Sequence, residues 1–99
     1  MRILGIDPAL RNTGYGVIEA RAGTCALVGY GVLSTPAKEL STACLQAIYQ
    51  GIREVIARTS PEAAAVEAII YVQSHRTAIT MGAARAAALL AVTEAGLPV

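Results

Sequence analysis

The sequence predicts an α/β domain whose elements follow the order β-β-β-α-β-α. Three observations lead to this prediction: runs of β-forming residues near the N-terminus, apolar residues at helical spacing in the middle, and a small-residue strand followed by an alanine-rich helix. The chain has 99 residues, of which 55% are hydrophobic, so it can build one core and is not disordered.

Three strands are predicted to form a meander at the N-terminal end. They span residues 2–6, 13–19 and 26–33. Between the first two strands, Pro8 fixes the backbone φ angle and Asn12 tolerates a left-handed backbone, which is typical of a turn. We therefore expect a loop that starts at Asp7.

A helix and a fourth strand are predicted next. The segment 34–36 (Ser-Thr-Pro) is a helix-start signal, and residues 40–56 carry an apolar residue at every fourth position. Residues 59–61 (Thr-Ser-Pro) end this helix. The predicted strand covers residues 63–67 and continues to residue 71. Its short side chains indicate a buried, parallel strand packed under helices.

The last predicted element is a helix from about Arg76 to Ala95. Its alanine-rich sequence favours a helix, and a Gly-Leu-Pro stop signal follows it. The chain ends where an α/β unit normally begins its next strand. We therefore expect either further residues or a partner chain to complete the sheet.

Composition excludes several classes of protein. Charged residues make up 15% and the formal net charge is +1, which gives no strong field toward nucleic acid or an anionic membrane. The longest apolar run, residues 86–92, is far shorter than the roughly 20 residues of a membrane-spanning helix, and no secretion signal is visible, so we expect a cytoplasmic protein. Cys25 and Cys44 lack the spacing of a metal site and are expected to be reduced thiols in the core.

Two carboxylates are candidates for chemistry. Asp7 is the only Asp and follows the first strand, and Glu67 ends the fourth. If these strands are neighbours, the two side chains converge at the carboxyl ends of the strands, where open α/β sheets bind ligands. Close carboxylates repel each other, and a hard divalent cation such as Mg²⁺ explains the arrangement. The alternative is that Asp7 caps the loop and Glu67 is merely solvated.

Several segments together resemble a known family. They are Leu4-Gly5-Ile6-Asp7-Pro8, Asn12-Thr13-Gly14-Tyr15-Gly16-Val17-Ile18, Val66-Glu67, Met81-Gly82 and Ala84-Arg85. Their spacing is similar to that of the N-terminal two thirds of the RuvC family of Holliday-junction resolvases. The resemblance implies a ribonuclease-H-like α/β fold with a mixed sheet and flanking helices, of which the C-terminal strand and helix are absent. Residues 1–99 are then an incomplete nuclease domain.

The resemblance also implies an activity and partners. It implies a homodimer that nicks four-way junction DNA symmetrically, depends on Mg²⁺ with Mn²⁺ as a substitute, and works with a junction-branch-migration helicase complex. Asp7 and Glu67 would be two of four catalytic carboxylates and would hold the metal ion. The other two are not in this chain. Because a two-metal phosphodiesterase needs enough anionic oxygens for both ions, we expect the chain alone to bind Mg²⁺ weakly and to cleave little or nothing.

Predicted DNA contacts lie in the first loop, before the last helix and on that helix. The residues are Arg11, Asn12, Ile70, Tyr71, His75, Arg76 and Arg85. Ile70 stands where the resembled family has a base-stacking Phe, and Tyr71 is an alternative stacking residue. The competing interpretations are a solvated His75 and an Arg85 side chain that only snorkels to water.

A strip of Gly82, Ala86 and Leu90 recurs at four-residue spacing on the last helix and allows another helix to approach closely. The resemblance assigns this helix to the dimer interface. The competing interpretation is packing on the sheet of the same chain.

Two other functions stay open. A phosphate-binding ATPase or kinase-type domain of the actin-like fold also has an Asp and a Gly-rich hairpin after its first strand. Its signature prefers Gly close after that Asp, where this chain has Pro8 and Ala9. The other is a non-catalytic fragment that binds DNA or dimerises.

Overall fold

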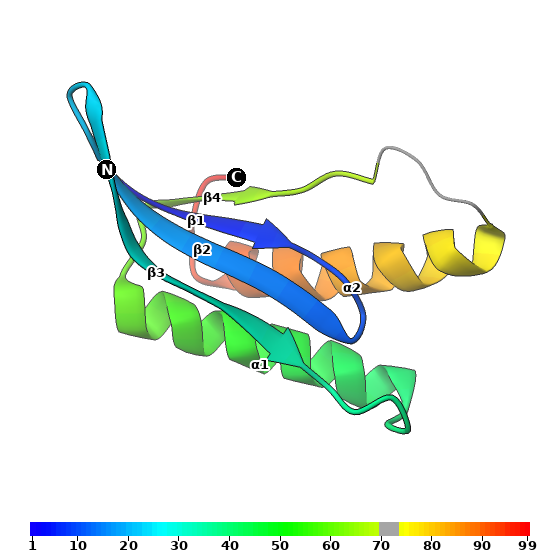
Figure 1. The fold of residues 1–99 in the computed structure, drawn as a ribbon. Coiled ribbons are helices and arrows are strands. Elements are labelled where there is room, and N and C mark those ends of the chain that lie inside the picture. The colour runs from blue at the N-terminus through cyan, green and yellow to red at the C-terminus, as the bar shows by residue number, and fades with distance from the viewer. Residues whose placement is uncertain (70–73) are drawn as a thin grey trace.

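The computed structural model describes residues 1–69 and 74–99 (Figure 1). Its elements are β1 (Arg2–Asp7), β2 (Asn12–Arg21), β3 (Thr24–Ser34), α1 (Ser41–Thr59), β4 (Ala63–Val66) and α2 (His75–Glu94). The predicted order β-β-β-α-β-α is confirmed.

The four strands form one mixed sheet in the order β3-β2-β1-β4. β1 is antiparallel to β2 and parallel to β4, so two strands that are distant in sequence end at the same edge. Both helices lie side by side on one face of the sheet (Figure 1). In the described part of the chain, neither helix is long and apolar enough to cross a membrane.

The core fills the space between this face and the helices. Successive side chains of a strand point to opposite faces, so alternate residues of β1 are buried, while the apolar stripe of α1 and the alanines of α2 face them. The largest contributors from the sheet and α1 are Leu4, Ile6, Val17, Ile48, Ile52 and Val55. Ala84 and Ala88 of α2 are completely buried, and their small side chains let this helix approach closely.

The predicted start of the first helix is wrong. α1 begins at Ser41, after the helix-start signal at residues 34–36. The Arg11 side chain donates hydrogen bonds to the carbonyl oxygens of Pro36 (3.0 Å) and Glu39 (3.2 Å), which holds the connection in a non-helical form. A tertiary contact therefore overrides the local helix signal.

Two further expectations are wrong. Cys25 is exposed, because it pairs with Ala20 next to the turn of the β2–β3 hairpin, and this end of the hairpin extends beyond the helices (Figure 1). Cys44 is buried as predicted. β4 ends at Val66, and residues 68–69 are exposed rather than part of a buried strand. The strand stops there because its pairing partner β1 ends at Asp7.

Candidate functional site

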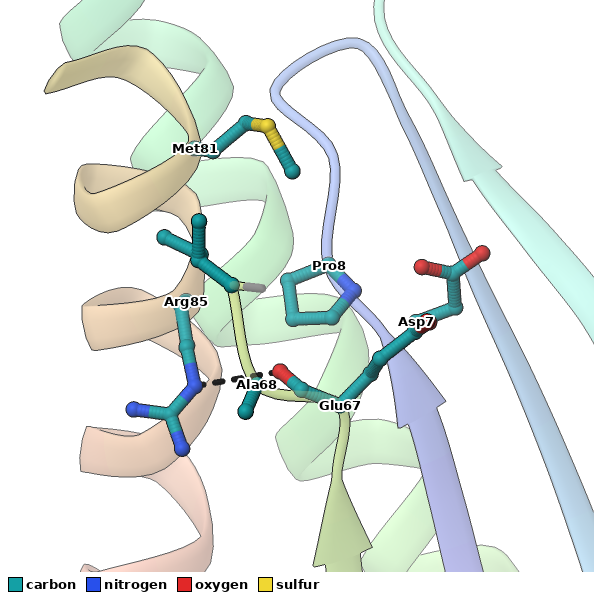
Figure 2. Close-up of a pocket in the computed structure, with 7 residues that line it drawn as sticks. Asp7, Pro8, Glu67, Ala68, Met81 and Arg85 are labelled. Atoms are coloured by element: carbon teal, nitrogen blue, oxygen red, sulfur yellow. Dashed lines mark hydrogen bonds between the residues drawn. The ribbon is translucent and has the colours of Figure 1, made fainter. Parts of the chain in front are cut away.

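The predicted carboxylate pair lies at the carboxyl ends of β1 and β4. Ile6 and Val66 are the last partners in the parallel register, and the Glu67 amide donates a hydrogen bond to the Ile6 carbonyl oxygen at 2.9 Å. Asp7 and Glu67 follow the same pair of residues, and matched positions of parallel strands direct their side chains to the same face. Figure 2 shows the Glu67 side chain extending toward Asp7. The expectation that these strands are neighbours is confirmed.

An open pocket of about 270 Å³ adjoins the pair. Its lining residues are Asp7, Pro8, Glu67, Ala68, Ile69, Met81 and Arg85. These residues come from the ends of β1 and β4 and from α2, so three elements meet at the pocket (Figure 2). The two carboxylates and the guanidinium group supply its charge.

The two carboxyl groups interact directly with each other. The pKa of Glu67 is raised above its usual value, first by the hydrogen bond with Asp7, then by the negative charge of Asp7, and last by desolvation. The guanidinium group of Arg85 donates from Nε to the main-chain carbonyl oxygen of Glu67 at 3.1 Å. Among the described residues, neither carboxylate forms a salt bridge. The pair is therefore a local concentration of negative charge that no side chain of the described residues neutralises through a salt bridge.

Glu67→Gln is expected to raise the melting temperature at neutral pH when a chelator has removed divalent cations. A carboxyl group whose pKa is raised on folding stabilises the folded state below its unfolded pKa, and this stabilisation is lost as the pH rises through the folded pKa. An amide does not ionise, so variant and parent should melt alike in acid and diverge toward neutral pH.

Circular dichroism melts between about pH 3 and pH 8 measure this difference. Glu54→Gln, on an exposed position of α1, removes one negative charge elsewhere and is the matched control. A Glu67→Gln melting temperature at or below that of the parent at pH 7 contradicts the expected repulsion.

The donor set of the pocket fits a hard divalent cation. Mg²⁺ takes oxygen ligands, keeps several waters, and binds through one or two carboxylates together with substrate phosphates. Asp7 and Glu67 provide two such carboxylates beside an open pocket. Within residues 1–69 and 74–99, no group of three or more His, Cys, Asp and Glu side chains could hold a metal ion. The described residues therefore offer a bound cation two carboxylate ligands, with the other positions left for water or phosphate.

The loop after Asp7 is held by Thr13, a residue that sequence reasoning did not single out as functional. Thr13 is completely buried, and its hydroxyl group accepts a hydrogen bond from the Ala9 amide (3.2 Å) and donates one to the Ala9 carbonyl oxygen (2.7 Å). These bonds close the loop beside Asp7. The available signal was the hydroxyl side chain four residues after Ala9, because Thr commonly bonds to nearby main-chain groups around turns.

The two predicted DNA contacts of the first loop bond within the chain. Besides its bonds to the connection before α1, Arg11 lies 3.2 Å from the buried Cys44 sulfur. Asn12 is the first residue of β2 rather than part of the loop, and its Oδ1 accepts a hydrogen bond from the Ser34 hydroxyl at 3.0 Å. Their contacts with DNA stay a prediction.

Two of the predicted DNA contacts lie at the start of the last helix. His75 and Arg76 are exposed residues in the first turn of α2, which Ser74 caps through its side chain, and their contacts with DNA stay a prediction. Ile70 and Tyr71 lie outside the described residues. The stacking residue therefore stays a prediction from the sequence.

The strip predicted at the dimer interface lies away from the core. Ala86 and Leu90 are exposed, and Gly82 is partly buried. Ala86 and Leu90 line an open, apolar groove of about 490 Å³ between α1 and α2. The contacts of α2 with the core come from Ala84 and Ala88 instead. An apolar strip is thus left at the surface of the described chain.

Comparison with protein families agrees with the motifs. A family model described as crossover junction endodeoxyribonuclease RuvC matches residues 3–99. The chain is 54% identical over 97 residues to the RuvC of Akkermansia muciniphila, covering 98% of this chain and 58% of that protein. It is 44% identical over 99 residues to the RuvC of Chloroflexus aggregans, covering 100% of this chain and 60% of that protein. The chain spans about three fifths of the length of these curated relatives.

Comparison with solved structures gives the same family. Thermus thermophilus RuvC in complex with a Holliday junction substrate matches with a TM-score of 0.90 and 32% identity, over 99% of this chain and 61% of that one. A second Thermus thermophilus RuvC structure matches with a TM-score of 0.86 and 33% identity, over 99% of this chain and 61% of that one. The Aquifex aeolicus PPX-GPPA enzyme, with a TM-score of 0.55 and 16% identity over 99% of this chain and 34% of that one, shows a shared fold alone.

The mixed four-stranded sheet with two helices on one face is ribonuclease-H-like, as the resemblance predicts. The family match covers residues 3–99, and the relatives exceed 40% identity over nearly the whole chain. The chain therefore belongs to the crossover junction endodeoxyribonuclease RuvC family.

Proposed function

We propose that this chain is part of a Mg²⁺-dependent endonuclease that resolves Holliday junctions by symmetric nicking. The observation that carries the proposal is the pairing of Asp7 with Glu67 at the ends of two parallel strands in a chain of the RuvC family. A solved relative with a TM-score of 0.90 is a RuvC in complex with a Holliday junction substrate, which supports junction DNA as the substrate class.

In this proposal Asp7 and Glu67 hold the cation, and Mn²⁺ substitutes for Mg²⁺. When bound there, such an ion would activate water and would stabilise the charge that develops on the phosphate oxygens. The protein contributes the direction of the two carboxylates and a closed loop at residues 8–11, which keeps the neighbouring backbone in place. Because two carboxylates are too few for a two-metal site, the 99-residue chain by itself cleaves little or nothing.

The proposed assembly is a homodimer, since each protomer then addresses one of two equivalent strands of the junction. The strip of Gly82, Ala86 and Leu90 beside the apolar groove is its proposed interface. The exposed His75 and Arg76 at the start of α2 are proposed to contact the DNA backbone. Cooperation with a branch-migration helicase complex in the cytoplasm completes the proposal.

The test is Mg²⁺-dependent cleavage of a synthetic four-way junction, compared with a linear duplex of the same sequence. The protein is assayed both as this chain and extended to the length of its relatives. We expect junction-selective, paired nicks from the extended protein and little or no product from the 99-residue chain. Equal cleavage of the linear duplex, or junction cleavage that persists in a chelator, contradicts the proposal.

A further inference from the structure

Arg85 lines the carboxylate pocket from α2 but does not pair with either carboxylate. Its Nε donates to the main-chain carbonyl oxygen of Glu67 at 3.1 Å, as the dashed line in Figure 2 shows. A guanidinium group beside carboxylates usually forms a charge-assisted pair with one of them. No such pair within 4.0 Å involves Arg85 in the described part of the chain. The hydrogen bond to the main chain therefore needs its own explanation.

The hydrogen bond from Arg85 helps to fix the main chain of Glu67, a residue that lines the pocket. The Glu67 amide is held by the Ile6 carbonyl oxygen at 2.9 Å, and its carbonyl group is held by Arg85. Both polar main-chain groups of this residue are thus fixed, although β4 has already ended at Val66 and residues 68–69 are exposed. The Arg85 hydrogen bond thus constrains the Glu67 carbonyl group at a position where β4 has already ended.

The helix that carries Arg85, α2, packs into the core. Ala84 and Ala88, which precede it by one residue and follow it by three, are completely buried in the core. Their small side chains allow α2 to pack closely enough for the Arg85 side chain to reach the end of β4. A helix that is packed into the core therefore contacts the main chain just beyond the end of β4.

We infer that Arg85 is a positioning residue: it holds the Glu67 carbonyl group and thereby directs the Glu67 carboxylate toward Asp7 for binding a divalent cation. This inference rests on the proposed function, because it assigns Arg85 a role at the same metal-binding pair. Residues that orient the ligands of a metal typically contribute about 10- to 100-fold to its affinity.

A positioning role and a purely electrostatic role predict effects of opposite sign. A positive side chain close to the site repels a bound cation, so its removal strengthens cation binding if charge alone matters. If the hydrogen bond matters, loss of the donor weakens binding even though the repulsive charge is gone. The side chain of Gln places its amide nitrogen the same number of bonds from Cα as Arg Nε, and Met has a methyl group at that place.

The experiment measures Mn²⁺ binding to this chain by electron paramagnetic resonance of the free ion. Arg85→Met is expected to weaken binding by about 10-fold, and Arg85→Gln, which keeps a donor without the charge, to bind close to the parent. Arg21→Met on the exposed β2–β3 hairpin is the matched control and should bind like the parent. Circular dichroism confirms that each variant is folded, and Arg85→Ala replaces Arg85→Met if the latter does not fold.

The Arg85 variants test the positioning role, and a variant of Asp7 tests the metal site on which the proposed function rests. Arg85→Met binding equal to or tighter than the parent overturns the positioning role, and so does equal weakening by Arg85→Met and Arg85→Gln. Asp7→Asn is measured in parallel. If Asp7→Asn binds Mn²⁺ as well as the parent, the metal site itself is elsewhere, and the proposed function fails together with the inference.

Discussion

Asp7→Asn is expected to abolish junction cleavage by the protein extended to the length of its relatives, while junction binding stays near the parent value. The substitution keeps the size of the side chain and removes the negative charge at the end of β1. Loss of a group that only orients a metal ligand typically costs about 10- to 100-fold. Loss of Asp7, itself a proposed ligand, should therefore reduce metal-dependent cleavage by more than about 100-fold. The cationic residues proposed to meet the DNA are untouched, so binding is expected to persist.

Cleavage of a labelled four-way junction and electrophoretic mobility shifts of the same junction measure the two effects separately. Glu54→Gln removes one negative charge on α1, away from the pocket lining, and should cleave like the parent. Parallel loss of cleavage and binding in Asp7→Asn assigns Asp7 a role in folding or in DNA contact. That result contradicts a metal-binding role.

Leu4→Ala is expected to lower the free energy of unfolding by about 2–5 kcal/mol, the usual cost of emptying a buried leucine site. Leu4 is completely buried in β1 between the sheet and the helices. For a domain of this size, such a loss is a large part of the roughly 5–15 kcal/mol that separates folded from unfolded chains. Urea denaturation followed by circular dichroism measures it.

Ile3→Ala is the matched control, because Ile3 precedes Leu4 on the same strand and directs its side chain to the opposite face. That face is not covered by α1 or α2 (Figure 1), and Ile3 is only partly buried. We therefore expect a clearly smaller loss of stability. Equal losses for Leu4→Ala and Ile3→Ala contradict a core that lies on one face of the sheet.

The fold was largely predictable because local patterns and tertiary packing agree for most elements. The stripe of apolar residues in α1 predicts its buried face, and the run of β-forming residues at 2–6 predicts β1. The failures occur where a distant residue decides the local structure. Arg11 keeps the connection before α1 from becoming helical, and the end of β1 stops β4 at Val66. Such contacts join segments that no local pattern connects.

The candidate site was predictable from topology more than from residue type. An Asp and a Glu that each follow a strand meet only if the strands are parallel neighbours, and the register Ile6 to Val66 provides that condition. The hydrogen bonds of Thr13 and the main-chain bond of Arg85 were not predicted, although the Thr13 hydroxyl offered a local signal. Both depend on which backbone groups lie within hydrogen-bond distance after folding.

A metal centre at the ends of β1 and β4 is tested most directly by titrating the isotope-labelled chain with Mn²⁺ and following the paramagnetic broadening of its amide signals. A cation held between the two carboxylates should broaden the signals of Asp7, Glu67 and their sequence neighbours first, and Asp7→Asn should remove this selective broadening. Broadening that centres on carboxylates elsewhere, such as Glu54 or Glu62, or that is unchanged in Asp7→Asn, contradicts a metal centre at the ends of β1 and β4.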